Sequence, residues 1–300
     1  MELRKSWSSR VLAHPLTRLL VGVIVVLAAV KAADLLTTPL AGSDVGRPIR
    51  AVFQVACAYG AYYVVIARLI EHRHTAGEIS PRIGHGMAGI ALGSIGAFAV
   101  VGSISWLGSV HLVRAGDVGS TLLVTSAMAI SSGFIEELLL RGLVFRLLEE
   151  WFGSWIALIL SAGVFGALHL GNDHASLWSA TAIALEAGLS LAILFMVTRN
   201  LWLAIGVHLA WNFWQGFLGV PVSGTATTGY LRTELDGPTW VTGGAFGYEA
   251  SAITVAYWLG IAVAFLVVAV RRRRIRPRPS RRVAQSHTAA PGSAPLSESS

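Results

Sequence analysis

The chain contains 300 residues, of which 54% are hydrophobic and only 13% are charged. A soluble domain carries about 25% charged residues, and several apolar runs here approach or exceed the roughly 20 residues that cross a bilayer as a helix. The composition excludes an ordinary soluble domain and predicts an all-α, polytopic transmembrane bundle of about eight helices. The single cysteine, Cys57, excludes an intrachain disulfide and a cysteine-based metal cage.

The formal net charge of +7 does not indicate a nucleic-acid-binding protein, because the basic residues are concentrated in one place. Eight of the 23 Lys and Arg residues lie in segment 271–282, directly after an apolar run. This position is typical of a segment that sets membrane orientation and contacts anionic lipid headgroups. We therefore expect lipid headgroups, and no nucleic acid, as partners of this segment.

Eight membrane spans are predicted, over residues 17–40, 51–70, 86–108, 120–148, 154–170, 176–198, 201–219 and 251–270. The first is predicted to be a retained helix rather than a signal peptide, because it lacks a small-residue cleavage site. Within it, Lys31 and Asp34 lie one turn apart and are expected to pair inside the bundle. Gly89 and Gly93 in the third span favour close helix packing.

The distribution of basic residues predicts the orientation of these spans. An even number of spans puts both termini on one side of the membrane. With the termini in the cytoplasm, seventeen Lys and Arg residues fall on the inner side, and only Arg47, Arg50, Arg114 and Arg232 fall on the outer side. This asymmetry satisfies the positive-inside rule, so we expect an integral, multi-pass protein with cytoplasmic termini.

Five parts are predicted along the chain: N-terminal transmembrane helices (1–118), a core that carries the polar motifs (119–219), an external loop (220–250), a last transmembrane helix (251–270) and a basic disordered tail (271–300). The many Gly, Thr and Pro residues of 220–250 argue against regular structure there. The tail beyond residue 276 is rich in Pro, Ser and Ala, a composition that does not build a core.

The fourth span contains three ionisable side chains in the stretch "SSGFIEELLLRG", residues 131–142. A charge at the centre of a membrane helix costs about 2.5–3.5 kcal/mol, so each of them needs a reason. Glu137 and Arg141 are four residues apart, share a helix face and are expected to pair. Glu136 points about 100° away from Glu137 and is predicted to be the carboxylate that stays available for chemistry.

Two further spans carry polar residues at the same four-residue spacing. The fifth contains "FGALH", with Phe165 and His169, and the seventh contains "HLAWN", with His208 and Asn212. Glu136 and His169 are almost equidistant from a predicted turn at 151–153, so an antiparallel hairpin places them at one depth. We predict one intramembrane pocket that contains a carboxylate, two imidazoles and an amide.

Such a set of side chains can hydrolyse a peptide bond. A carboxylate beside a histidine can take a proton from water, and a histidine and an asparagine can donate hydrogen bonds to an oxyanion. Alternatively, Glu136, His169 and His208 can bind zinc with water as the fourth ligand. The residues leave both chemistries open. Glu186 in the sixth span is expected either to bond a neighbouring helix or to line the pocket.

The ordered motifs resemble those of the CPBP family, which is the CAAX prenyl protease, Abi and bacteriocin-processing family of intramembrane proteases. The family pattern is Glu-Glu-x-x-x-Arg, then Phe-x-x-x-His, then His-x-x-x-Asn, and "EELLLRG", "FGALH" and "HLAWN" match it in order. The resemblance covers about residues 120–216. It departs at Leu140, where an aromatic residue often precedes the arginine in the family.

This resemblance implies an α-helical membrane endopeptidase that cuts a membrane-embedded or lipidated substrate, which in some members is a prenylated protein. It implies a glutamate-activated water without a required metal, although zinc stays open. It also implies roles for individual residues: Glu136 as the base, His169 as a holder of the water, His208 and Asn212 as the oxyanion site, and Glu137, Arg141 and Phe165 as supports.

Two other functions compete with the protease. The same pocket suits a non-catalytic peptide-binding or immunity protein, and buried Glu and His residues also build the relays of proton-coupled transporters. The relay gives no role to His208 and Asn212 as a donor pair, which favours the protease. Other intramembrane protease types fit less well, because the sequence lacks HExxH, GxSG and GxGD motifs.

Overall fold

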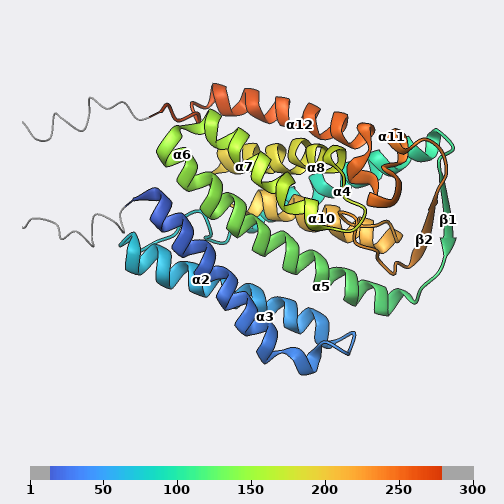
Figure 1. Ribbon diagram of the computed structural model, residues 1–300, viewed down its shortest axis with the longest axis horizontal. Coiled ribbons are helices and arrows are strands. Elements are labelled where there is room, and N and C mark those ends of the chain that lie inside the picture. Colours follow the sequence, from blue (N-terminus) through green and yellow to red (C-terminus); the bar gives the residue numbers. More distant parts are fainter. Residues whose placement is uncertain (1–13, 279–300) are drawn as a thin grey trace, which may run out of the picture.

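The computed structural model describes residues 14–278 and is almost entirely helical (Figure 1). The N-terminal half contains α2 (Pro15–Leu36), η1 (Thr38–Leu40), α3 (Gly46–Ala61), η2 (Tyr62–Ile70), α4 (Ile83–Trp106), β1 (Val110–Arg114), α5 (Val118–Glu137), η3 (Leu138–Phe145) and α6 (Arg146–Phe152). The remainder contains α7 (Ser154–Leu168), η4 (His169–Gly171), α8 (Leu177–Ile183), η5 (Ala184–Leu189), α9 (Ser190–Thr198), α10 (Trp202–Leu218), β2 (Leu231–Leu235), α11 (Thr239–Thr242), η6 (Gly244–Phe246), η7 (Tyr248–Ala250) and α12 (Ala252–Arg271).

Each of the eight predicted spans corresponds to a helical segment. Seven segments of the described chain are long and apolar enough to cross a membrane, and they are Pro15–Leu36, Gly46–Ile70, Ile83–Trp106, Val118–Phe152, Ser154–Gly171, Leu177–Thr198 and Ala252–Arg271. The eighth predicted span is α10, which has only 17 residues and is mostly buried among the other helices. The protein is therefore a polytopic, integral membrane bundle.

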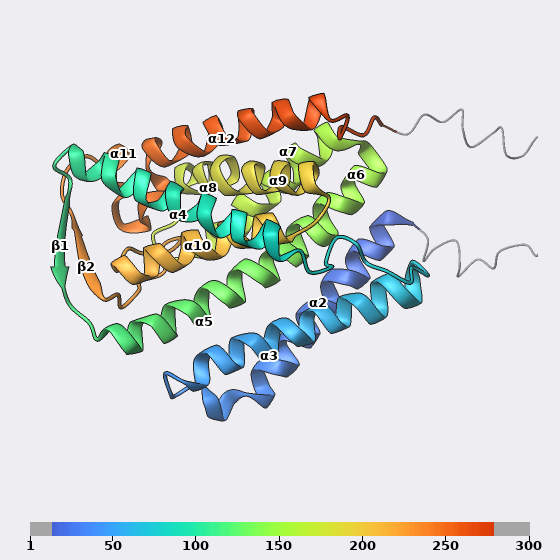
Figure 2. The same ribbon diagram turned by 180° about the vertical axis from the view of Figure 1, so that it is seen from behind.

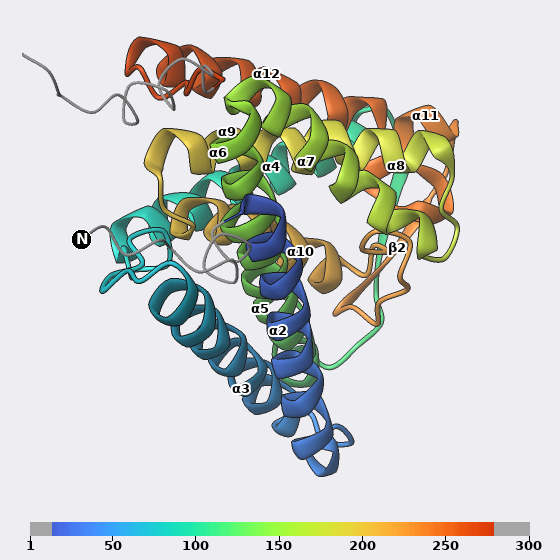
Figure 3. The ribbon, with the colours of Figure 1, turned by 60° about the vertical axis from the view of Figure 1, so that its left-hand side comes forward.

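The helices surround α10, which lies at the centre of the bundle. Figure 2 shows α4 crossing one face next to α10, and Figure 3 shows α2 and α3 on the side of the bundle away from α12. The first and last described residues lie at one end of the bundle, and the antiparallel pair β1–β2 closes the other end (Figure 1). The common end agrees with an even number of crossings.

One prediction about local structure is wrong, and a second is confirmed only in part. Segment 220–250 is not irregular throughout, because β2 pairs with β1 and short helices follow it. The irregular sequence hid this strand, whose partner lies more than 100 residues earlier in the chain. Lys31 and Asp34 do pair, at 3.5 Å, but the Lys31 side chain is 71% exposed and Asp34 is also bound by Arg50 and Gln54 of α3. Most of the predicted tail lies outside the described residues.

Glycines of α4 bring it against the backbone of α10. A Cβ atom at Gly89 would lie 2.3 Å from the carbonyl oxygen of Leu203, and one at Gly93 would lie 2.5 Å from that of Val207. Gly206 of α10 likewise lies in close contact with the backbone of Gly86. The predicted close packing at Gly89 and Gly93 is confirmed, and it holds α10, the carrier of His208 and Asn212, in a fixed position.

Alanine at Gly93 is expected to destabilise the protein, because its methyl group must displace backbone of α10. Overpacking of this kind costs about 1–3 kcal/mol. The control is Gly102→Ala in the same helix, where an added Cβ meets nothing within 4 Å. Thermal unfolding in detergent should show a lower melting temperature for Gly93→Ala only. Equal melting temperatures for the two variants would contradict tight α4–α10 packing.

A network of ion pairs lies at the end of the bundle where α2 begins. Arg18 pairs with Glu71 and Glu150, Arg146 pairs with Glu71, and Arg73 pairs with Glu71 and Glu78. Arg18, Arg73, Arg146 and Arg199 were all predicted to lie on one side of the membrane, and they line one polar pocket here. Their shared location agrees with the prediction that they lie on one side of the membrane.

Within this network, the loop residue Glu78 makes stability depend on pH. Burial alone would raise the pKa of Glu78, but hydrogen bonds from Arg73 and Tyr62 and the charge of Arg146 lower it from 4.5 to about 2. Because the folded-state pKa is depressed, the carboxylate contributes stability that is fully present above about pH 4.5 and is lost as the pH falls through 2.

The Glu78→Gln variant is therefore expected to be less stable than the wild type at neutral pH. The difference should shrink between about pH 4.5 and pH 2, where the wild-type carboxylate takes up its proton. Melting temperatures of both forms across this range test the expectation. The exposed pair partner Glu234 provides a control, and a Glu234→Gln variant should follow the wild type. A pH-independent gap between Glu78→Gln and the wild type would contradict the assignment.

Candidate active site

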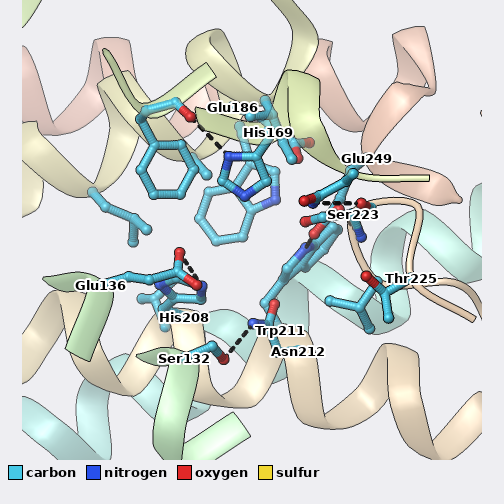
Figure 4. A pocket seen from close by; sticks show the side chains of 18 of the residues that line it. Ser132, Glu136, His169, Glu186, His208, Trp211, Asn212, Ser223, Thr225 and Glu249 are labelled. Carbon is cyan, nitrogen blue, oxygen red and sulfur yellow. Dashed lines mark hydrogen bonds and ion pairs between the residues drawn. The ribbon is translucent and has the colours of Figure 1, made fainter. Parts of the chain in front are cut away.

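A cavity of about 200 Å³ lies between α5, α7, η5 and α10 on the side of the strand pair. This volume holds several water molecules, since one water needs roughly 10–15 Å³ by the same measure. Its wall is formed by Met128, Ser132, Glu136, Phe165, His169, Asn172, Ile183, Glu186, Ala187, Leu191, Val207, His208, Trp211, Asn212, Val222, Ser223, Thr225, Glu249 and Trp258. Figure 4 shows Glu136, His208, Ser132 and Asn212 along one side of the cavity, and His169 and Glu186 across from them.

The hairpin that brings the first two motifs together turns where it was predicted. Gly153 ends α6 and begins α7 with φ of +81°, a conformation that favours glycine. The turn makes α7 run back along η3 and α5, so Glu136 and His169 reach the same cavity. The third motif arrives on α10, and the wall of one cavity thus contains Glu136, His169, His208 and Asn212.

Glu136 lies in the last turn of α5, and its side chain is 34% exposed toward the cavity. The nearest imidazole nitrogen, His208 Nε2, is 3.9 Å from Glu136 Oε2, which is beyond hydrogen-bond distance. The two side chains therefore make no direct hydrogen bond, and Glu136 borders the open space of the cavity. Glu136 is therefore the carboxylate of this helix that faces open space, as the helix geometry predicted.

Glu137 and Arg141 lie behind the cavity wall and are both completely buried. Arg141 Nη1 donates to Glu137 Oε1 at 2.7 Å, which confirms the predicted pair. The same carboxylate oxygen also lies 2.9 Å from His208 Nδ1. Because a carboxylate only accepts, the Nδ1–H of His208 donates to it and Nε2 is left for the cavity. The residue spacing did not reveal this link between the first and third motifs.

Two π-helical segments meet around Arg141. η3 begins directly after Glu137, and η5 follows α8. The wider turn of a π-helix leaves some carbonyl groups without their usual partners, and such turns are frequent at functional sites. Arg141 Nη2 donates to two η5 carbonyls, those of Ala187 at 2.8 Å and Gly188 at 3.1 Å. One guanidinium thus joins the helix of the first motif to the opposite wall of the cavity.

Phe165 connects the second motif to the other two. Its ring lies 4.7 Å from the guanidinium carbon of Arg141, and its centroid is 4.7 Å from that of His169. The His169 Nδ1–H donates to the Phe165 carbonyl oxygen at 2.8 Å, because a carbonyl can only accept. The other ring nitrogen, Nε2, is turned away from that carbonyl toward the cavity (Figure 4). In neutral His169 this nitrogen is an acceptor.

Asn212 is held by a residue that the sequence analysis missed. Its Nδ2 group donates to Ser132 Oγ at 2.9 Å, and Ser132 Oγ donates in turn to the carbonyl of Met128. One amide hydrogen of Asn212 is thereby used, and the second is left for another acceptor. Ser132 lies four residues before Glu136, and the same helical spacing that linked the other motif residues was a usable signal for it.

The sequence did not predict Glu249 and Ser223 at the rim of the cavity. Glu249 Oε1 accepts from Trp211 and Gln215 of α10, and its Oε2 accepts from the backbone N–H and the hydroxyl of Ser223. Asn172 Nδ2 donates to the Ser223 carbonyl at 2.8 Å. The local sequence gives no signal for these contacts, since each of them joins distant parts of the chain. Glu186, which was expected either to bond a helix or to line the pocket, lines it.

The zinc alternative depends on Glu136, His169 and His208 converging on one point. In the part of the chain that the structure describes, no group of three His, Cys, Asp or Glu side chains is arranged to hold a metal ion. Nδ1 of each imidazole is held, by Glu137 and by the Phe165 carbonyl, and Nε2 is left, an arrangement that a metal-binding histidine also has. Because the three candidate side chains do not converge on one point in this arrangement, no step below is assigned to a metal.

The fold and the cavity define a polytopic helical membrane protein with a water-accessible cavity that carries polar side chains on a largely apolar wall. Residues 118–214 match the family model described as Rce1-like, type II CAAX prenyl endopeptidase Rce1-like. The match contains all three motifs and confirms the family resemblance predicted from them. The Rce1-like family is a protease family, which supports an enzyme that is a hydrolase. No curated protein and no solved structure matched the chain.

Proposed function

We propose that the protein is an intramembrane endopeptidase that hydrolyses a peptide bond with a water molecule activated by Glu136. The observation that carries this proposal is the shared cavity wall, on which an open carboxylate, two imidazoles and an amide lie around space for water. The protease family match supports the same activity. The contacts within the site suggest a role for each of these side chains.

The attacking water would lie between Glu136 and the Nε2 atom of His169. Both groups accept hydrogen bonds, so together they can orient a water molecule and leave its lone pair directed at a carbonyl carbon. Glu136 takes one proton as the oxygen attacks the scissile carbonyl. When the tetrahedral intermediate collapses, Glu136 returns this proton to the leaving amine, and the new carboxyl group keeps the water oxygen.

The negative charge that develops on the carbonyl oxygen needs donors. Asn212 has one amide hydrogen left after its bond to Ser132. His208 donates through Nε2 when its ring is protonated at both nitrogens, since Nδ1–H is held by Glu137. One such donor can be worth about 10²–10³ in kcat. The Glu137–Arg141 pair holds His208 in this orientation.

The substrate would be a membrane-embedded or lipidated peptide or protein. Apolar side chains such as Ile183, Leu191 and Val222 form much of the cavity wall and suit a hydrophobic segment. The basic residues after α12 would contact anionic lipid headgroups. With the termini in the cytoplasm, as the charge distribution predicts, the rim near β1 and β2 would face the other side of the membrane.

Cleavage of a membrane-presented peptide by purified protein tests this function. The peptide is supplied in vesicles, and the products are identified by mass spectrometry in water enriched in ¹⁸O. A hydrolase yields two fragments, and the new carboxyl group carries ¹⁸O. A binding or immunity protein leaves the peptide intact, and that outcome would overturn the proposal. The activity should also survive a zinc chelator, because no step is assigned to a metal.

A further inference from the structure

Three carboxylates line the cavity, and the proposed mechanism uses only one of them. Glu136, Glu186 and Glu249 are on the wall, while the same wall contains no Lys or Arg among the described residues. The nearest guanidinium, that of Arg141, is already paired with Glu137 behind the wall. The wall thus carries three carboxyl groups and no Lys or Arg, and among its described residues His208 is the side chain that the proposed mechanism uses as a cation.

Glu249 supplies a fixed negative charge at the rim. Four donors from Trp211, Gln215 and Ser223 satisfy its two oxygens. None of these donors carries a charge, so they stabilise the ionised carboxylate without cancelling its field. The carboxylate is also held in place, because its partners belong to α10 and to the turn that follows it.

Glu186 differs from the other buried carboxylates of the described chain in its hydrogen bonding. It is only 1% exposed, and neither of its oxygens has a hydrogen-bond partner. The other buried acids are engaged: Glu137 by Arg141, Glu78 by Arg73 and Glu149 by Arg199. A buried carboxyl group without a partner costs several kcal/mol, so its position calls for a partner that comes from outside the chain.

The backbone around Glu186 is not free to move the carboxyl group away. It lies in η5, and the carbonyls of the next two residues, Ala187 and Gly188, are held by Arg141. A Cβ atom at Gly188 would lie 3.0 Å from the Cα of Ala162, so the segment is also pressed against α7. The arrangement that orients the Glu137 pair thus also keeps Glu186 on the cavity wall.

We infer that Glu186, assisted by the fixed charge of Glu249, forms a subsite for a positively charged group of the substrate. A lysine or arginine side chain close to the scissile bond has the chemistry to fill it. This inference rests on the proposed function and narrows it to peptides with a basic residue near the cleaved bond.

Matched peptides test this subsite. In one set, each position around the cut carries lysine or its uncharged isostere norleucine, and kcat/KM is measured for each pair with the wild type and with Glu186→Gln. The wild type should favour lysine at one position by about 10- to 100-fold, as expected for a hydrogen-bonded charge. This ratio should fall toward one in Glu186→Gln and stay unchanged in the exposed control Glu234→Gln.

Binding measurements separate this inference from the proposed function. Fluorescent lysine and norleucine peptides are titrated onto Glu136→Gln protein, which is expected to bind without cutting. Equal dissociation constants for the two peptides would overturn the subsite even if cleavage is observed. If the lysine peptide binds more tightly but the wild type cleaves neither peptide, the result would support the subsite and contradict the proposed protease function.

Discussion

Glutamine in place of Glu136 is expected to lower kcat for peptide cleavage by about 10²- to 10⁴-fold, which is the contribution typical of a general base. The amide has nearly the same shape as the carboxylate but cannot take a proton from water. Glu136 makes no buried ion pair, and its side chain is 34% exposed, so the variant should fold as the wild type does. Cleavage rates in vesicles, with melting temperatures measured on the same samples, test both parts.

The Glu234→Gln variant is the matched control, because it makes the same chemical change on the exposed strand β2. It should cleave at the wild-type rate. If Glu136→Gln also cleaved at the wild-type rate, Glu136 would not be the base, and the mechanism would be wrong. The neighbouring Glu137 would not replace Glu136 as the base, because its carboxylate is occupied by Arg141 and His208.

Methionine in place of Arg141 is expected to have the largest effect on stability. It leaves the fully buried Glu137 carboxylate without its cation, and breaking a buried pair in this way costs about 3–5 kcal/mol. It also releases the carbonyls of Ala187 and Gly188 from their donor. For a chain of this size, the melting temperature should fall by roughly 10 °C. Activity should fall too, because His208 loses the orientation that Glu137 gives it.

Two comparisons make this result specific to the buried pair. The Arg232→Met control removes an arginine that is 65% exposed, and such surface pairs are worth about 0–1 kcal/mol. The double variant Glu137→Gln with Arg141→Met removes both charges and should recover part of the lost stability. A double variant that is less stable than Arg141→Met alone would contradict the view that the lone carboxylate is what costs the stability.

Several features were predictable because they depend on neighbours in the chain. The pairing of Glu137 with Arg141 and the free orientation of Glu136 follow from helix geometry. The turn at Gly153 and the close packing at Gly93 follow from the conformational freedom and small size of glycine. The three motifs carried enough of this local information to indicate one cavity and a protease family.

Other features depend on contacts that no local pattern encodes. His208 reaches Glu137 across 71 positions in the chain, and Trp211 reaches Glu249 across 38. The strand β2 was missed because its sequence resembles a loop and its partner is far away. The absence of a hydrogen-bond partner for the Glu186 oxygens depends on the three-dimensional positions of all its neighbours. A carboxylate in a membrane helix indicates a binding partner or a function, but its position in the sequence does not identify which of these it has.

The short length of α10 has a consequence for how water reaches the reaction. Seventeen residues rise about 26 Å as an α-helix, some 4 Å less than a typical hydrocarbon layer. Because α10 is buried among the other helices, its short length leaves room at its end for protein backbone rather than for lipid. The turn after α10, with Ser223 and Thr225, lies there on the cavity wall. Hydrolysis consumes one solvent molecule per turnover, and polar backbone at this depth would let the bulk phase replace it without a channel through the lipid.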